Sequence, residues 1–408
     1  MLPNNSPLLL DEIIAARQRI ADGVQQTPCL KSIPLSELCG ADVFCKLEYL
    51  QRTGSFKERG ARNALLLLDD AARKRGVIAA SAGNHAQALA YHGGLLGIPV
   101  TVVMPEFAPL IKRENCKKLG ARVLLAGDSF AAARRHADQH VASEGLTYVH
   151  GYDDRAVIAG QGTLGLEVME QVPNLDAIIV PVGGGGLIAG VSLAVKSLRP
   201  EVQVIGVESA AMPSFTAAIE TGQPTEVESS PTLADGLAIP KLGDRAFAIL
   251  RNYVDRALQV DEHQIALAIL RLMELEKAVV EGAGATPLAA LLTGKLKNLA
   301  GKRVVLVLAG GNVDLNVLQR LIEIGLVADG RLIRFSTRIS DRPGGLAQLA
   351  RLISEADASI VEVTHDRIFA GLDFTAVNVL CTVETRDREH IRQLFELLER
   401  HGFQASPR

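Results

Sequence analysis

A lysine at the predicted start of a helix is the first residue whose type and position suggest chemistry. Lys57 lies in the segment 53–58, ahead of the helical stretch 59–68, and the spacing of Ser55 and Glu58 predicts a capping box that begins the helix at Ser55. The positive end of a helix dipole disfavours an ammonium group in the first turn. The same field lowers the pKa of the amine, which favours a Schiff base with an aldehyde cofactor. A capped helix with an exposed lysine is the alternative interpretation.

Four consecutive glycines form a second candidate site. The predicted strand 177–182 leads into the glycines 183–186, and a helix is predicted over 187–198. Where a strand is followed by a glycine run that opens a helix, the bare backbone amides and the helix dipole can converge on a phosphate. A tight turn without a ligand is the alternative, although four glycines cost more conformational entropy than a turn requires.

The same glycines leave a different class of enzyme open. Gly184-x-Gly186-x-x-Ala189 fits the dinucleotide fingerprint, and Glu208 follows at the distance expected for a ribose-binding carboxylate. A nicotinamide dehydrogenase therefore competes with an enzyme that binds another phosphate. The Walker pattern is absent, because no G-K-[S/T] follows.

An amide-rich loop between a predicted strand and a predicted helix is the third candidate. The loop consists of Ser81, Ala82, Gly83, Asn84 and His85. Successive amides at a helix start can receive a carboxylate. Asn84 is the better functional candidate because its amide both donates and accepts, whereas His85 is expected to cap or pack more readily than to act as a base.

The elements that must position these residues alternate in type. Short apolar runs and helix-length segments alternate from about 77 to 309, which is the βαβ rhythm of a largely parallel sheet covered on both faces. The predicted strands are 77–80, 100–104, 122–125, 177–182, 202–207 and 304–308, and the longer predicted helices include 84–96 and 187–198.

The pattern changes after 325–330, which has glycine at each end and is expected to be a break. A strand at 331–339, a helix at 346–355, strands at 358–365 and 373–382, a helix at 388–400 and a short strand after Gly402 then form a predicted βαββα unit. A unit of about 80 residues is small but plausible for a domain. We place the boundary near residue 328.

Composition excludes several classes of protein. The 408 residues are 48% hydrophobic and 22% charged, with a formal net charge of -3. This balance gives no global attraction for nucleic acid or anionic lipid, and neither a signal peptide nor an apolar run of membrane-spanning length occurs. None of the five cysteines is part of a C-x-x-C pair, so we expect reduced, mostly buried thiols. We expect a cytoplasmic protein with no membrane or nucleic-acid partner.

Taken together, these motifs resemble the fold-type II pyridoxal-phosphate (PLP) enzymes, and within them the threonine/serine dehydratases. The resemblance spans about 8–325 and implies two open, mainly parallel sheets, with a smaller subdomain at about 45–150 inserted in a catalytic domain of residues 1–327. It rests on six motifs in the family's order: Thr53-Gly-Ser-Phe-Lys-Glu-Arg-Gly-Ala-Arg-Asn63, Ser81-Ala-Gly-Asn-His-Ala-Gln87, Gly160-Gln-Gly-Thr163, Gly183–Leu187, Leu233-Ala-Asp-Gly236 and Glu281-Gly-Ala-Gly-Ala285.

The resemblance implies a role for each matched residue. Lys57 would carry PLP as a Schiff base and then act as the base at the substrate Cα, Phe56 would pack beside the cofactor ring, and Asn84 would bond its ring oxygen. Ser81, Ala82, Gly83, Asn84 and His85 would hold the substrate carboxylate. The cofactor phosphate would be held by Gly183, Gly184, Gly185, Gly186 and Leu187.

Two departures from the family pattern bear on the reaction. Ala82 stands where racemases of the group have a serine base, so elimination is favoured over racemisation. Ala309 stands where relatives usually have Ser or Cys beside the pyridine nitrogen, so we expect a neutral ring and elimination with little carbanion character. We expect no metal near Glu208, because Ser214 replaces the carboxylate that some relatives have there.

The C-terminal unit, 328–408, resembles an ACT regulatory domain. The resemblance depends on the loop between its first strand and helix, and it implies a homo-oligomer with an amino-acid effector, such as isoleucine or valine, at the pairing interface. A glycine turn that only opens a helix is the alternative. The candidate effector residues are Asp341, Pro343, Gly344, Gly345 and Leu346.

The predicted function is therefore an allosteric threonine ammonia-lyase of amino-acid metabolism, such as isoleucine biosynthesis. L-threonine would give 2-oxobutanoate and ammonia, and L-serine would give pyruvate. One methyl group is worth only about 1–3 kcal/mol in a pocket, so serine or 3-hydroxyaspartate ammonia-lyase stays open. A dehydrogenase or a catalytically silent amino-acid sensor is the further alternative.

Overall fold

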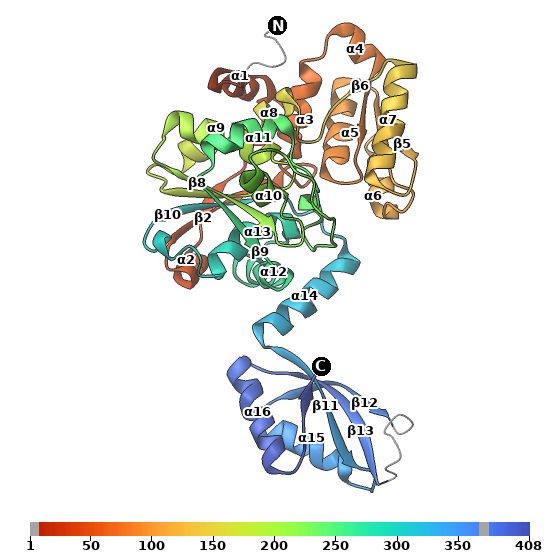
Figure 1. Cartoon of the computed structure of the whole chain (residues 1–408), viewed down its shortest axis with the longest axis vertical. Coiled ribbons are helices and arrows are strands. Elements are labelled where there is room, and N and C mark those ends of the chain that lie inside the picture. The colour runs from red at the N-terminus through yellow and green to blue at the C-terminus, as the bar shows by residue number, and fades with distance from the viewer. Residues whose placement is uncertain (1–7, 367–374) are drawn as a thin grey trace. The chain divides into compact units, whose positions relative to one another are not determined.

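The chain divides into two compact units, Met1–Asp314 and Leu315–Arg408 (Figure 1). The computed structural model describes residues 8–366 and 375–408. The predicted break at 325–330 is wrong for most of its length, because helix α14 (Leu315–Asp329) continues through it. A single glycine inside a helix costs only about 1 kcal/mol. The chain leaves the helix at Gly330, whose φ is 75°, and the expected boundary near 328 falls at this end of α14.

The larger sheet of the first unit has six strands in the order β1-β2-β10-β7-β8-β9. All neighbouring pairs are parallel except β1 with β2. The predicted strands of this sheet are confirmed to within two residues at each end. Its strands are β1 (Cys29–Lys31), β2 (Asp42–Leu47), β7 (Ala177–Pro181), β8 (Gln203–Ser209), β9 (Arg256–Val260) and β10 (Arg303–Leu308).

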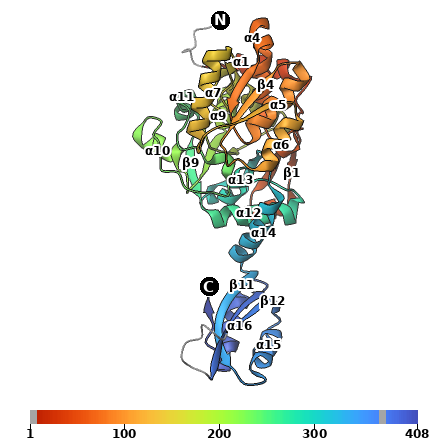
Figure 2. The ribbon, with the colours of Figure 1, turned by 90° about the vertical axis from the view of Figure 1, so that its right-hand side faces the viewer.

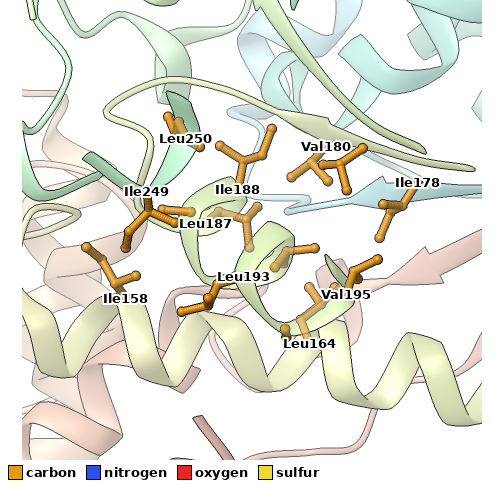
Figure 3. Packing of buried hydrophobic residues seen from close by; sticks show 14 of the residues in the cluster. Ile158, Leu164, Ile178, Val180, Leu187, Ile188, Leu193, Val195, Ile249 and Leu250 are labelled. Atoms are coloured by element: carbon orange, nitrogen blue, oxygen red, sulfur yellow. The ribbon is translucent and has the colours of Figure 1, made fainter. Parts of the chain in front are cut away.

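Helix α9 (Gly186–Leu198) packs against this sheet, and helix α8 (Arg155–Gln171) packs against α9. The labelled apolar side chains of α8 and α9 interlock in Figure 3, next to those of β7. The helices approach so closely that a Cβ on Gly190 of α9 would lie 2.3 Å from the carbonyl oxygen of Ile158. Glycine is required at this crossing.

The smaller sheet of the first unit is fully parallel, in the order β5-β4-β3-β6. Strands β3, β4 and β5 and helix α5 have the predicted bounds. Its elements are β3 (Val77–Ala80), α5 (Asn84–Leu96), β4 (Val100–Met104), α6 (Leu110–Lys118), β5 (Arg122–Leu125), α7 (Phe130–Glu144) and β6 (Thr147–Tyr148). Two separate, mainly parallel sheets confirm the predicted fold class.

The remaining helices of the first unit cover the sheets or connect them (Figures 1 and 2). They are α1 (Leu10–Ile20), α2 (Ile33–Cys39), η1 (Glu48–Leu50), α3 (Lys57–Leu66), α4 (Asp70–Arg75), α10 (Ser214–Thr221), η2 (Asp235–Leu237), α11 (Asp244–Tyr253), α12 (Glu262–Glu276), α13 (Gly282–Leu292) and η3 (Lys297–Leu299). In the described part of the chain, no helix has both the length and the apolar character needed to cross a membrane.

A buried network of four charges joins α3 to its neighbours. The guanidinium of Arg59 bonds both oxygens of Glu48 at 2.7 and 2.8 Å and both oxygens of Glu167, on α8, at 2.6 and 2.8 Å. Lys46 of β2 also donates to Glu167, at 2.6 Å. The two cations and two carboxylates are all buried, and their charges balance.

The C-terminal unit is an antiparallel sheet with two helices. The strand order is β12-β13-β11-β14, and alternate residues of β11 and β13 are buried. The predicted element order is confirmed, although the start of the predicted strand 373–382 lies outside the described residues. The elements are β11 (Leu332–Ser340), α15 (Gly345–Glu355), β12 (Ser359–Asp366), β13 (Ala376–Glu384), α16 (Arg388–Arg400) and β14 (Ser406–Pro407).

Candidate active site

A cavity of about 600 Å³ brings the three predicted motifs of the first unit together. The lysine segment follows β2 and η1, the amide-rich loop follows β3, and the glycine run follows β7. All three strands lie in parallel pairs, and α/β folds commonly bind ligands at the carboxyl ends of such strands. Every residue expected to bind the cofactor or the substrate lines this cavity. They are Phe56, Lys57, Ser81, Ala82, Gly83, Asn84, His85, Gly183, Gly184, Gly185, Gly186, Leu187 and Ala309.

Lys57 is the first residue of α3 and its amine is held inside this cavity. The Nζ donates to the carbonyl oxygen of Gly151 at 2.6 Å and lies 5.1 Å from the centroid of the Phe56 ring. Burial lowers the pKa of the amine to about 8, and the nearby Glu281 opposes this shift in part. About a tenth of the amine is therefore neutral near pH 7, far more than for an ordinary lysine, and the neutral form is the one that a nucleophile or base requires.

The predicted capping box is wrong. Helix α3 begins at Lys57 with no side-chain cap, and the Ser55 hydroxyl is buried without a partner. The Glu58 carboxylate instead accepts from the backbone amide of Thr53 and from His92, the latter at 3.1 Å. Ser55 pairs through its backbone with Gly310, and this long-range contact overrides the local capping pattern.

The glycine run passes against Tyr152, which excludes side chains from it. A Cβ on Gly184 would lie 2.3 Å from the Tyr152 ring, and a Cβ on Gly186 would lie 2.4 Å from its carbonyl oxygen. Gly185 has a φ of 88° and precedes the first turn of α9. First-turn amides have no acceptor within their own helix. Bare amides at the start of a 13-residue helix, open to the cavity, suit a phosphate.

The side chain of Asn84 connects three segments of the chain. Its Nδ2 donates to Glu281 at 2.8 Å, and its Oδ1 accepts from Asn312 at 2.8 Å. Asn312 also donates to the carbonyl oxygen of Thr53, the first residue of the lysine segment, at 2.7 Å. One hydrogen on Asn84 Nδ2 stays available to a ligand.

Two histidines that line the cavity are held neutral. His85 donates through Nε2 to the carbonyl oxygen of Val149 at 3.0 Å, and burial lowers its pKa to about 3. His150 accepts through Nδ1 from the amides of Tyr152 and Asp153, at 3.3 and 2.9 Å, so its proton is on Nε2. Burial lowers the pKa of His150 to about 4. His85 therefore serves to position the loop, in line with the capping or packing role expected for it.

Several polar residues that line the cavity were not predicted as site residues, among them Glu281, Asn312 and His150. Of these three, only Glu281 belongs to one of the motifs that match the family, the segment 281–285. Glu281 is buried at the start of α13, and burial, followed by the charge of Asp235, raises the pKa of its carboxyl to about 8. No local spacing marks such a residue, because its chemistry comes from segments far away in the sequence.

The raised pKa of Glu281 predicts a pH dependence of stability. In the folded protein the carboxyl keeps its proton up to about pH 8, whereas in the unfolded chain it ionises near the ordinary value of 4.5. The unfolded state therefore binds fewer protons in this window, and stability falls as the pH rises. Each unit of pKa difference is worth about 1.4 kcal/mol. We expect Glu281→Gln to raise the free energy of unfolding near pH 8 by a few kcal/mol, with little change at the acid end of the window.

Urea unfolding at several pH values, on the wild type and Glu281→Gln, measures this effect. Glu220→Gln, at an exposed position of α10, is the matched control and should keep the wild-type pH dependence. An unchanged pH dependence in Glu281→Gln would contradict the assignment.

The residue that supported the dinucleotide alternative has a different role. Glu208 is buried in β8, and its carboxylate accepts from the amides of Phe215 and Thr216 at 2.7 and 3.0 Å, at the start of α10. It is not among the residues that line the described cavity. Its chemistry is that of a helix cap.

The candidate effector residues lie in the C-terminal unit, where they form the turn between β11 and α15. Gly344 has a φ of 97° and α15 begins at Gly345. The amide of Asp341 donates to the carbonyl oxygen of Thr375 at 3.1 Å. The predicted turn at the start of a helix is confirmed; an effector role for it stays a prediction.

Comparisons with known proteins agree with this geometry. A sequence profile of the family described as "Pyridoxal-phosphate dependent enzyme" matches residues 20–310. The chain is 44% identical to the L-threonine ammonia-lyase of Thermotoga maritima over 398 residues, which is 98% of this chain and 99% of that protein. It is 45% identical to the L-threonine ammonia-lyase of Geobacter sulfurreducens over 388 residues, 95% of this chain and 96% of that protein. The solved structure of processed threonine deaminase isoform 2 from Solanum lycopersicum matches with a TM-score of 0.74 and 33% identity, covering 79% of this chain and 97% of that one.

Proposed function

The chain belongs to the family of pyridoxal-phosphate dependent enzymes, and from that membership we infer that it is an L-threonine ammonia-lyase, which converts L-threonine to 2-oxobutanoate and ammonia. The observation that carries the inference is the match over 98% of the chain to an L-threonine ammonia-lyase. The racemase alternative is disfavoured because Ala82, in the cavity wall, has no group that could return a proton.

The residues of the cavity fit the cofactor. The amides of Gly183–Leu187 would hold its phosphate, because the neighbouring Tyr152 leaves room for backbone alone at Gly184 and Gly186. Lys57 would bind its aldehyde, Phe56 would pack beside its ring, and Asn84 would bond the ring oxygen with its remaining amide hydrogen. Ala309 lines the same cavity and offers the ring nitrogen no side-chain partner. When bound, PLP supplies the electron sink that stabilises charge left at the substrate Cα.

The protein's own groups bind the substrate and move its proton. The first-turn amides of α5 and the Ser81 hydroxyl would receive the substrate carboxylate. The Lys57 amine, with its pKa lowered to about 8, would accept the proton from Cα as a general base. The fixed Nε2–H of His150 is a neutral donor in the cavity wall, suited to orient a substrate hydroxyl without adding charge.

Release of ammonia and 2-oxo acid from L-threonine, L-serine and 3-hydroxyaspartate tests the proposed activity. We expect all turnover to require PLP and kcat/KM for threonine to exceed that for serine by about 10-fold or more, the usual worth of one methyl group in an apolar pocket. Chiral analysis of the remaining substrate should find no D-isomer. Turnover of none of the three substrates, or a preference for serine, would contradict the assignment.

The finer regulatory and cellular assignments rest on the resemblance to ACT domains and on composition. We propose that the C-terminal unit is such a domain, that the turn 341–346 binds an amino-acid effector, and that subunits associate through this unit. An antiparallel sheet with two helices supports this proposal. A role in isoleucine biosynthesis and a cytoplasmic location stay predictions.

A further inference from the structure

Two histidines on α7 face each other one helical turn apart. His136 and His140 are four residues apart and therefore share one face of the helix. Their Nε2 atoms are 3.3 Å apart, and their rings meet edge to face at 71° with centroids 4.9 Å apart. Both side chains are partly exposed, so a small ion can reach them. This pair lies outside the cavity described above.

A carboxylate determines which nitrogen of His140 is available. The Nδ1 of His140 lies 2.6 Å from an oxygen of Glu144, the next residue along this helix face. An ionised carboxylate can only accept, so Nδ1 carries the proton and Nε2 presents its lone pair to His136. A histidine held in this way by a carboxylate is the usual arrangement around a protein metal ligand. The carboxylate of Glu144 also pairs with Arg122 at 3.2 Å, which helps to hold it in place.

The separation of the two nitrogens matches that of two ligands on one metal ion. Zinc binds imidazole nitrogen at about 2.0–2.1 Å, so two ligands at a tetrahedral angle are about 3.3 Å apart. The observed Nε2–Nε2 distance is 3.3 Å. A hydrogen bond between the rings, with His136 as the donor, also suits this distance; a bound ion would replace that proton.

We propose that His136 and His140 chelate a divalent transition-metal ion, with Glu144 orienting His140 and water completing the coordination. Imidazole ligands select zinc, nickel and copper rather than magnesium or calcium. Two protein ligands make a site of modest affinity. On the same helix, the carboxylate of Glu144 pairs with Arg122, and that of Asp138 pairs with Arg134 at 2.9 Å. The two imidazoles, rather than carboxylates, are the proposed metal ligands.

The site lies on a helix that also contributes to the active-site cavity. Ser129, Phe130 and Ala131, at the start of α7, line the cavity. One turn further on, the guanidinium of Arg134 stacks 3.6 Å from the ring of Tyr148, which lines the cavity as well. The metal site is independent of the proposed deamination, because neither histidine touches the cavity.

Calorimetric titration of the holoenzyme with Ni²⁺ tests the proposal. We expect one site per chain in the wild type and at least a 10-fold loss of affinity in His140→Gln and in His136→Gln. His263→Gln, which removes an exposed histidine on α12, is the matched control and should bind as the wild type does. Equal affinity in the wild type and His140→Gln, or an equal loss in His263→Gln, would overturn the proposal.

A second variant tests the role of the carboxylate. Glu144→Ala leaves both histidines but removes the group that orients one of them, and loss of such a partner typically weakens metal binding about 10–100-fold. Threonine turnover should stay at the wild-type level in all four variants, which shows that they fold. Full nickel affinity in Glu144→Ala would refute the orienting role, and Mg²⁺ binding as tight as Ni²⁺ binding would refute imidazole ligation.

Discussion

Replacement of Lys57 by alanine is expected to abolish threonine deamination. The variant loses the amine that we propose binds the cofactor aldehyde and takes the Cα proton, and proton transfer by a positioned group alone is worth about 10²–10⁴-fold in rate. In the wild type this amine donates to the carbonyl oxygen of Gly151 and lies 5.1 Å from the centroid of the Phe56 ring. Steady-state assays of 2-oxobutanoate release, together with the visible absorbance of the bound cofactor, measure both losses.

The matched control is Lys117→Ala, which removes an exposed lysine of α6 that pairs with Glu114. It should keep the wild-type rate and absorbance. Loss of a general base should slow the reaction at least about 100-fold. If Lys57→Ala retained more than about a tenth of the wild-type rate, Lys57 would not be the general base. If Lys57→Ala still bound the cofactor but did not turn over threonine, the loss of rate would be due to the missing base rather than to loss of the cofactor.

Among the variants discussed, Arg59→Leu is expected to lower the free energy of unfolding the most. Arg59 is fully buried and bonds two carboxylates, each through two oxygens. Removal of one partner from a buried ion pair leaves an uncompensated charge and costs about 3–5 kcal/mol. Lys46 still compensates Glu167 in the variant, so Glu48 is the carboxylate left without a cation. Urea unfolding of the wild type and the variant measures the difference.

The control for Arg59→Leu is Arg17→Leu, at an exposed pair with Glu170. Exposed ion pairs contribute only about 0–1 kcal/mol, so this variant should unfold close to the wild type. Equal and small losses in both variants would show that the buried network does not stabilise the fold. Because α3 begins at Lys57, two residues before Arg59, we expect the network also to hold Lys57, the proposed catalytic residue, in position.

The sequence by itself determined the elements and the motifs they carry. Strands β3, β4 and β5 and helices α5 and α16 have their predicted bounds, because apolar periodicity and glycine positions act within a few residues of the chain. The lysine segment and the glycine run were also apparent, since each is a contiguous stretch with an unusual residue type at a helix start. Their order along the chain was sufficient to indicate the family.

Only the tertiary structure decided which side chains meet. Asn84 bonds Glu281 across 197 positions and Asn312 across 228, and Arg59 reaches Glu167 across 108. Ser55, predicted to cap α3 locally, pairs through its backbone with Gly310 instead. The shifted pKa values of Lys57 and Glu281 arise from burial in a cavity that distant segments enclose. Local patterns determine backbone conformation, whereas burial and charge partners depend on contacts that form only when the sheets assemble.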